Sequence, residues 1–374
     1  MQQKINDFIN NSSQTELTFN ELLNGKERLA IHEYCEKVGL FSKSEGNGKQ
    51  KGIIIYKQKP IISSEEKVSD DDRKQFIKDF GLPIPVYKEP YFSYFLETLD
   101  TILDTKKKYR LLLDAIENLD QRGKKLKTFT MELSNKIIQQ ISEQNIYQQF
   151  TKDTSKATSK YITKDLPPDV EIYSRNGEFP KVLFSLDIIK ANFSSMKFHN
   201  PEIVFNCNTW EELIKRYTDI PYFTQAKFFR QIIFNRLSSK GIPIIQKYLL
   251  CQLNNNIKSY VNVLGRTGND ELIISSTHLT YKDDLATIDK IMNELPDNNK
   301  SIWRVTPFIL SPLGKTDIFV KKNLLNGSIE IKHIDKDFYT QAYKYYMNIP
   351  LNENDMKAMK DDYLITYDEP YIFE

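Results

Sequence analysis

Two short stretches of the sequence hold carboxylates where burial would make them costly. In "VLGRTGNDELIIS", residues 263–275, Asp270 and Glu271 stand in a turn between two apolar runs. A hairpin turn explains Asp270, because Asp forms local hydrogen bonds and accepts left-handed backbone conformations. One interpretation is therefore a solvated hairpin tip. It leaves Glu271 unexplained, because this residue begins the second run and a buried carboxylate needs a partner or a metal ion.

A third carboxylate ends another apolar run. The segment "KVLFSLD", residues 181–187, reads as a buried strand that finishes at Asp187. If this strand lies beside the hairpin, Asp187 meets Asp270 and Glu271 at one edge of a sheet. Carboxylates on neighbouring strands hold the divalent ions of phosphoryl transfer, and Mg²⁺ prefers such oxygen ligands. The pattern predicts a catalytic site for Mg²⁺, or Mn²⁺, formed by these three residues, with a nucleoside triphosphate as a partner.

The elements around these carboxylates alternate between strands and helices. This mixed order favours an α+β fold whose sheet is not purely parallel. We expect strands at 181–187, 302–310, 316–321 and 328–333, the hairpin at 263–275, and helices near 209–217, 225–237, 243–257, 281–294 and 337–348.

The order strand, helices, strand, turn, strand resembles the palm superfamily of nucleotidyltransferases. The likeness is greatest to the tRNA-His guanylyltransferase branch and the GGDEF-type nucleotide cyclases. It rests on Asp187 with the following segment 188–192 and Phe193, and on the acidic pair after the glycine-containing turn. A reverse-transcriptase-like palm is an alternative, because "GIPIIQKYL" at 241–249 is similar to its second motif.

The palm resemblance implies roles for individual residues. Asp187 and Asp270 would bind the metal, with Glu271 as a third ligand or as a group that supports the ligands. The backbone carbonyl of Ile188 would add a further ligand. For the nucleotide and its phosphates, the resemblance and the basic residues of the middle segment favour Lys190, Asn192 and Arg230.

A separate cluster of polar residues lies near the N-terminus. Arg28 and His32 are four residues apart in a predicted helix, so their side chains project from one face. The loop expected after this helix supplies Ser42 and Ser44. The segment from residue 43 to 59 contains five lysines, Lys49 and Lys51 among them, but only one acidic residue, Glu45. Cations beside hydroxyls are what binding to phosphates requires.

This block resembles a small domain named for its Arg, three-residue gap, His motif, the R-three-H domain. The matching features are Arg28 and His32, "GL" at 39–40, the serines at 42 and 44, the glycines at 46 and 48, and the closing strand "GIIIYK". The resemblance implies binding of single-stranded RNA or DNA, with Arg28 and His32 on the binding face.

The chain of 374 residues is long enough for two or three domains. We expect four regions: a small α/β nucleic-acid-binding domain at 1–62, a charged linker at 63–90, a helical hairpin with a connector at 91–168, and a palm-like, ferredoxin-like antiparallel domain with helices at 169–374.

Composition favours an intracellular protein without a membrane partner. The formal net charge is only +2, so any basic surface must be local. The three cysteines are odd in number and widely spaced, which favours a reducing compartment, cytoplasmic or nuclear. No run approaches the roughly 18 apolar residues of a membrane helix, and the first residues lack the apolar core of a signal peptide.

Two functions from different classes follow from these observations. The first is a metal-dependent nucleotidyltransferase that acts on RNA or DNA and is tethered to its strand by the N-terminal domain. The alternative is a non-enzymatic protein that binds single-stranded nucleic acid or serves in assembly, with a degenerate palm domain.

Overall fold

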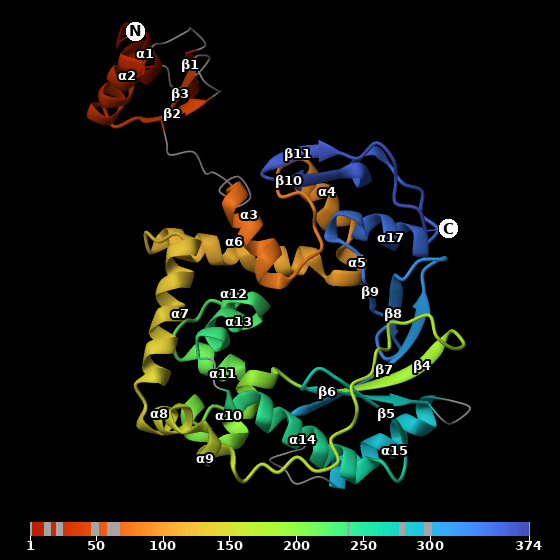
Figure 1. The fold of residues 1–374 in the computed structure, drawn as a ribbon. Coiled ribbons are helices and arrows are strands. Elements are labelled where there is room, and N and C mark those ends of the chain that lie inside the picture. The colour runs from red at the N-terminus through yellow and green to blue at the C-terminus, as the bar shows by residue number, and fades with distance from the viewer. Residues whose placement is uncertain are drawn as a thin grey trace. The chain divides into compact units, whose positions relative to one another are not determined.

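The computed structural model divides into two compact units, Met1–Lys67 and Val68–Glu374 (Figure 1). The structure describes residues 2–10, 16–19, 25–45, 52–57, 68–237, 240–276, 281–294 and 301–373. Mixed helix and sheet in both units confirms the expected α+β class.

In the first unit, two helices share a core with one face of a three-stranded antiparallel sheet of order β1-β3-β2. Ile53 and Ile55 of the last strand are fully buried against Ile31 and Cys35 of the second helix, while Ile54 between them is half-buried. The described elements are α1 (Gln2–Asn10), β1 (Glu16–Phe19), α2 (Gly25–Lys37), β2 (Phe41–Glu45) and β3 (Gly52–Tyr56).

Ser42 and Ser44 lie on a strand and not in the expected loop. Strand β2 pairs with β3 from Phe41 opposite Tyr56 to Glu45 opposite Gly52. The serines and lysines of this segment have low strand propensity, but ladder hydrogen bonds to the apolar β3 override it. Lys49 and Lys51 fall outside the described residues.

Helices open the second unit, and the first of them lies where a charged linker was expected. Residues 63–67 of the predicted linker are outside the described part. From Asp70 on the linker prediction is wrong, because a helix begins there. Ser69 caps the helix by accepting a hydrogen bond from the backbone of Asp72, and Phe76 is fully buried. The acidic run that suggested a solvated linker is the first turn of this helix, where negative charge is favourable. The helices are α3 (Asp70–Phe80), α4 (Tyr91–Thr98), α5 (Asp100–Leu103), α6 (Thr105–Gln121), α7 (Leu126–Ser142), α8 (Asn145–Lys152) and α9 (Thr154–Thr158).

The two long helices α6 and α7 do not form the expected hairpin. The predicted break between them is present, but Figure 1 shows them meeting at a corner instead of lying side by side. Helix α7 packs along α13, whereas α6 packs on α3, α4 and α12. Their apolar residues belong to the same core as the helices that cover the sheet, so this region is not separate from the rest of the unit.

A six-stranded antiparallel sheet of order β5-β6-β4-β7-β8-β9 forms the other part of the unit. Every expected strand of this region is present, with bounds shifted by three residues at most. The strands are β4 (Lys181–Ile188), β5 (Asn262–Thr267), β6 (Glu271–Ser275), β7 (Trp303–Pro312), β8 (Phe319–Asn323) and β9 (Ile329–Lys332).

The first four strands along the chain, β4 to β7, follow a βαββαβ order, and β6 and β4 are the inner two of these four in the sheet. Helices α10 (Ala191–His199), α11 (Trp210–Lys215), α12 (Tyr222–Gln225), α13 (Lys227–Arg236) and α14 (Gly241–Ile257), with the 3₁₀ turn η2 (Pro201–Val204), join β4 to β5. Helix α15 (Tyr281–Glu294) lies between β6 and β7 in the sequence. The remaining elements are η3 (Lys336–Phe338), α17 (Tyr339–Tyr346), η4 (Glu353–Met356), β10 (Lys357–Lys360) and β11 (Tyr363–Thr366).

The two faces of the sheet have different coverings. Phe184, Leu186 and Ile188 of β4 join the large core with the helices, whereas Leu183 joins a separate apolar cluster that includes Ile172. Because side chains alternate along a strand, Ser185 and Asp187 point to the same face as Leu183. Asp187 therefore lies on the face opposite the helical core.

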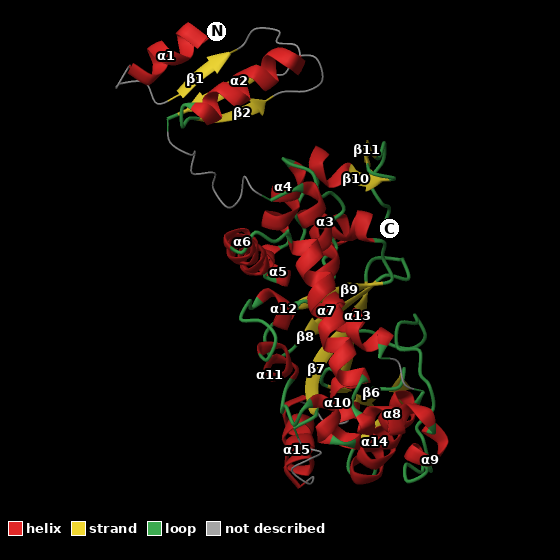
Figure 2. Ribbon diagram, turned by 90° about the vertical axis from the view of Figure 1, so that its left-hand side faces the viewer, coloured by secondary structure: helices red, strands yellow, loops and turns green. Residues whose placement is uncertain are grey.

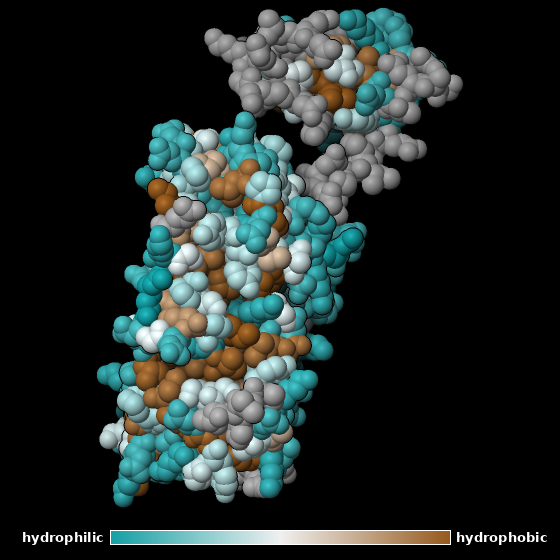
Figure 3. Space-filling model, turned by 90° about the vertical axis from the view of Figure 1, so that its right-hand side faces the viewer, coloured by the Kyte–Doolittle hydropathy of each residue, from teal (hydrophilic) through white to brown (hydrophobic). Residues whose placement is uncertain are grey.

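Seen from the side in Figure 2, helices of the second unit stand in front of the strands. The opposite side, in Figure 3, shows a band of apolar side chains across this unit with hydrophilic surface above and below it. All three cysteines are free and buried. No helix in the described part of the chain is both long and apolar enough to cross a membrane.

Candidate functional site

The predicted nucleic-acid-binding residues of the first unit gather on α2 and β2. Ser42 and Ser44 are two residues apart on β2, so their hydroxyls face the same side. The His32 ring lies between them, with Nδ1 2.7 Å from the Ser42 hydroxyl oxygen and Nε2 2.9 Å from that of Ser44. Arg28 precedes His32 by one helical turn and is half-buried. Three residues chosen from the sequence therefore contact one another, and the fourth, Arg28, lies one turn away on the same helix.

The contacts of His32 indicate what it does there. A neutral imidazole has one donor and one acceptor nitrogen, so it satisfies two hydroxyls at once. The ring fixes β2 against α2 and orients both serines. One hydroxyl accepts the ring N–H and keeps its own proton for another acceptor, so the surface presents a hydroxyl donor and a guanidinium, both suited to phosphate oxygens.

Comparison with known proteins supports this view of the first unit. Residues 1–57 match the R-three-H domain. The DExH-box ATP-dependent RNA helicase DExH6 of Arabidopsis thaliana is 32% identical to the chain over 66 residues, which are 18% of this chain and 5% of the helicase. The match thus spans a small part of that relative. No solved structure matches the chain. The R-three-H resemblance is confirmed, and with it nucleic-acid binding as the property of the N-terminal domain.

In the second unit, a distorted hairpin carries the acidic pair. A bulge interrupts the pairing of β5 with β6 between Val263 and Gly265, and Gly265 has a positive φ of 154°. A side chain there would collide with Pro168, because its Cβ would lie 2.5 Å from the Pro168 carbonyl oxygen. Arg266 bonds the turn carbonyl of Gly268 and places Nη2 2.6 Å from Asp169. The segment before β4 therefore fastens the hairpin.

The sheet register brings the three predicted carboxylates together. Asp187 lies directly opposite Glu271 across the β4–β6 pair. The backbone N–H of Ile188 donates to the carbonyl of Asp270 at 2.9 Å, while the Ile188 side chain is buried. Glu271 is only 27% exposed at its side chain, which is not what a solvated hairpin tip would show.

Two of these carboxylates already have partners. The Ser185 hydroxyl donates to one oxygen of Glu271 and the Thr267 hydroxyl to the other. Arg304 of β7 binds Asp187 with two parallel hydrogen bonds, from Nε at 3.1 Å and from Nη2 at 2.7 Å. Such bidentate pairs are among the stronger charge-assisted contacts.

Asp270 is in a less favourable position. Burial raises the pKa of its carboxyl, and the charges of Glu271 and Asp187 raise it further. A carboxyl whose charged form is destabilised in this way by burial and like charges is typical of functional sites.

The carboxylates as placed do not fit a divalent cation. Across the described residues, no group of three or more His, Cys, Asp and Glu side chains could hold a metal ion. The reason is visible in the contacts, since Arg304 takes both oxygens of Asp187 and two hydroxyls take those of Glu271. Asp270 alone is then too few ligands.

A polar cavity of about 600 Å³ lies over these residues. Besides the carboxylates it is lined by Arg304, Lys227, Lys321 and Lys332, together with Glu330. Burial acts to raise the pKa of Glu330, but the lysines, Lys332 first, lower it overall. The sequence analysis did not select three of these cations, Arg304, Lys321 and Lys332. Their only signal in the sequence is that they alternate with apolar residues along β7, β8 and β9.

The three predicted phosphate-binding residues are not brought to this cavity. Lys190 forms an ion pair with Glu211. The Asn192 side-chain oxygen accepts a hydrogen bond from Gln246 at 3.2 Å. Burial lowers the pKa of Arg230, partly offset by the charge of Glu211. The polar groups of these three residues thus interact with other residues of the helices that follow β4.

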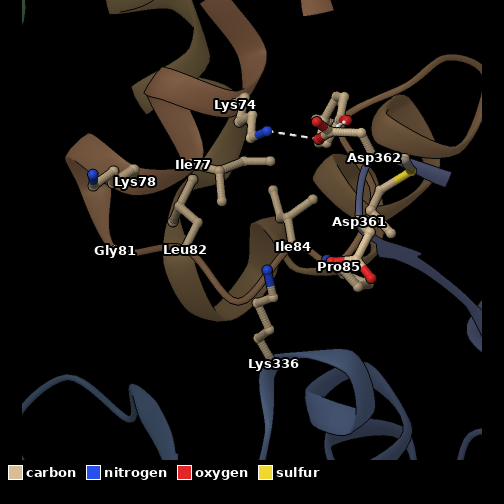
Figure 4. A pocket seen from close by; sticks show the side chains of 12 residues that line it. Lys74, Ile77, Lys78, Gly81, Leu82, Ile84, Pro85, Lys336, Asp361 and Asp362 are labelled. Atoms are coloured by element: carbon tan, nitrogen blue, oxygen red, sulfur yellow. Dashed lines mark hydrogen bonds and ion pairs between the residues drawn. The ribbon is translucent and has the colours of Figure 1, made fainter. Parts of the chain in front are cut away.

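A second cavity, of about 710 Å³, lies between α3 and the β10–β11 turn (Figure 4). Ile77 and Ile84 are among its apolar lining residues, and Figure 4 shows Lys336 reaching toward it from below. Lys74 Nζ and the Tyr87 hydroxyl both reach the same oxygen of Asp362, at 2.6 and 2.7 Å. These contacts fasten the hairpin, so the cavity is a weaker candidate for chemistry than the carboxylate cavity.

Proposed function

We propose that the protein binds single-stranded RNA or DNA through the Arg28 and His32 face of its first unit. The observation that carries the proposal is the gathering of Arg28, His32, Ser42 and Ser44 on α2 and β2, within the segment that matches the R-three-H domain. Positively charged and hydroxyl donors on one surface attract the phosphate backbone without reading its sequence.

Titration of the full-length chain with a fluorescent single-stranded oligonucleotide tests this proposal. The double variant Arg28→Ala with His32→Ala should weaken binding about tenfold or more, because hydrogen bonds to charged groups contribute about 1.5–3 kcal/mol. Arg110→Ala, which removes an exposed arginine from α6, is the matched control. Equal affinity and equal salt dependence in the double variant and the control would contradict the proposal.

As a second candidate function, we propose nucleotidyl transfer at the carboxylate cavity, in a palm-like domain. Support comes from the βαββαβ order of the first four strands of the sheet and from the position of Asp187, opposite Glu271 on the neighbouring strand and next to the turn that holds Asp270. Their face lies opposite the helical core and opens to a cavity of about 600 Å³. Fold alone does not establish activity, so the residues must be tested.

The ion pair between Arg304 and Asp187 makes a sharp test. Arg304 is 65% exposed at its side chain and Asp187 22%, so the guanidinium can leave at low cost while the carboxylate stays in place. If the site serves a cation, Arg304→Gln should bind Mn²⁺ more tightly than the wild type, as followed by the electron paramagnetic resonance of free Mn²⁺. Asp270→Asn in the same background should abolish the gain.

Activity is tested separately with labelled nucleoside triphosphates, a single-stranded acceptor and Mg²⁺ or Mn²⁺. Incorporation by the wild type that is lost in Asp270→Asn would support the transferase. Absence of incorporation, together with no Mn²⁺ binding by wild type or Arg304→Gln, would leave a nucleic-acid-binding protein without this chemistry.

A further inference from the structure

A third cavity of the second unit, which we call the lysine pocket, has a one-sided charge. It measures about 750 Å³ and lies among α8, α9 and the end of α10, which are neighbours in Figure 1. Lys152, Lys156 and Lys160 line it, and Asp153 is the only acid among its lining residues. At neutral pH this lining therefore carries a net positive charge.

The three lysines are exposed, and none of them forms an ion pair within the described residues. Asp153 does not neutralise them by direct contact, because its carboxylate caps α9 and accepts the backbone N–H of Lys156 at 3.0 Å. The Lys160 ammonium lies 5.1 Å from the centre of the Tyr161 ring. The cations thus remain available to an anion from outside.

His199 forms part of the lining without adding charge. Its Nδ1 lies 3.0 Å from the Tyr161 hydroxyl, and its ring centre lies 4.4 Å from that of Phe150. Burial, followed by the charge of Lys160, lowers the pKa of His199 to about 4, so the ring is neutral at physiological pH. The pocket therefore combines three exposed cations with a neutral, partly aromatic wall.

We propose that the lysine pocket binds backbone phosphates of the same single-stranded nucleic acid that the first unit holds. This inference rests on the proposed nucleic-acid binding. Proteins neutralise the phosphates of a single strand mainly through charge, which does not require the cations to stand at fixed positions. Three lysines within nine residues are sufficient for such binding. A strand already bound to the first unit reaches a second site on the same chain at high effective concentration. An acidic protein would have no such tether.

The test compares two triple variants of the full-length chain. Lys152→Gln, Lys156→Gln and Lys160→Gln together remove the three positive charges of the pocket lining. Lys107→Gln, Lys125→Gln and Lys127→Gln remove the same charge from exposed positions of α6 and α7 and from the residue before α7. Affinity for a long single-stranded oligonucleotide is measured over a range of salt concentrations. The slope of log affinity against log salt should fall by about 2 in the pocket variant, since each phosphate contact of a single strand contributes about 0.7. The control should keep the wild-type slope.

Three outcomes would overturn the inference. One is a pocket variant with the slope of the control, provided that thermal unfolding shows both to be folded. Another is an equal loss of slope in both variants, which would indicate that the strand responds to the total positive charge of the protein and not to this pocket. The last is a pocket variant that loses binding of a nucleoside monophosphate yet keeps the slope for the strand, which would assign the pocket to a free nucleotide.

The Arg28→Ala and His32→Ala variant, measured alongside, separates the two proposals. If it loses affinity while the pocket variant does not, only the lysine pocket fails. If it keeps its affinity while the pocket variant loses slope, the first-unit site fails and the second unit alone contacts the strand.

Discussion

The two units present their candidate sites in opposite ways. In the first, Arg28, His32, Ser42 and Ser44 come from a helix and the next strand, so a short stretch of sequence contains the whole surface. In the second, Asp187, Asp270 and Arg304 come from three different parts of the chain. A local motif can be recognised in a sequence because the spacing of its residues along the chain largely determines where they lie in space. A dispersed site depends on strand order and register, which spacing does not reveal.

The units also differ in how they use charge. The arginine and histidine of the first unit are half-exposed beside hydroxyls. Several charges of the second unit are committed to partners inside the protein, as in the pairs Lys344–Asp355 and Arg304–Asp187. Substitutions in the second unit should therefore change stability first, whereas those in the first should change binding.

The largest effect is expected at Lys344. Its ammonium lies 2.7 Å from Asp355 and 2.8 Å from the Tyr94 hydroxyl, and the Asp355 side chain is 0% exposed. Lys344→Met leaves a buried carboxylate unpaired and should lower the free energy of unfolding by about 3–5 kcal/mol. Unfolding by denaturant measures this loss of stability, and the affinity for an oligonucleotide should stay unchanged. Lys344→Met with Asp355→Leu should recover part of the loss, and equal stability of wild type and single variant would refute the buried pair.

The next largest effect depends on pH at Asp79. Burial raises the pKa of Asp79 to about 6, although hydrogen bonds from Tyr222 and Gln75 act in the other direction. In the unfolded chain this carboxyl ionises near pH 4. The folded state thus binds the proton more tightly between these values, and stability should fall by about 3 kcal/mol as pH rises from 4 to above 6. Asp79→Asn should remove this step from the melting temperature measured against pH, whereas the exposed Asp71→Asn should keep it.

A matched pair at the carboxylate cavity tests whether Asp270 is strained by its neighbours. Asp270→Asn removes a carboxylate that burial and two like charges disfavour, so the free energy of unfolding at pH 7 should rise by about 1 kcal/mol. Asp187→Asn takes the charged partner from Arg304 but also relieves Asp270 of one like charge, so stability should change by less than about 1 kcal/mol. Thermal unfolding of both variants decides, and an Asp270→Asn variant no more stable than the wild type would show that this carboxylate is not strained by its neighbours.

The smallest effect is expected at Ser42. Ser42→Ala removes one of the two hydroxyls that hold the His32 ring, and it should lower stability by about 0.5 kcal/mol because the contact is half-exposed. The His32 ring keeps its bond to Ser44, so oligonucleotide affinity should fall only slightly. Nuclear magnetic resonance of the His32 ring protons would detect the lost contact. A loss of affinity as large as that of Arg28→Ala would assign Ser42 a direct phosphate contact.

Helix α3 and strand β2 differ from what their local sequence predicts, and the physical cause is the same in both. The acidic start of α3 looked like a linker, because the buried Phe76 that makes it a helix of the core lies beyond the charged run. The serines of β2 looked like a loop, because their pairing partner β3 is a separate segment. In both places tertiary contacts override local propensity. Arg304 had no local signal, since only its register opposite Asp187 gives it a role.

Amino-acid order alone was enough for the α+β class, for the strands of the large sheet and for the R-three-H domain of the first unit. These features depend on periodicity and on residues close in the chain, where short-range geometry dominates. Three-dimensional packing alone decided that Arg304 neutralises Asp187, that Lys190 and Arg230 lie with Glu211 and away from the cavity, and that three lysines surround a pocket. The first two pairings join segments that are distant in sequence, and the fold brings them together only after it has closed the loops between them. The lysines themselves are close in sequence, but they line a pocket only together with His199 of the later α10.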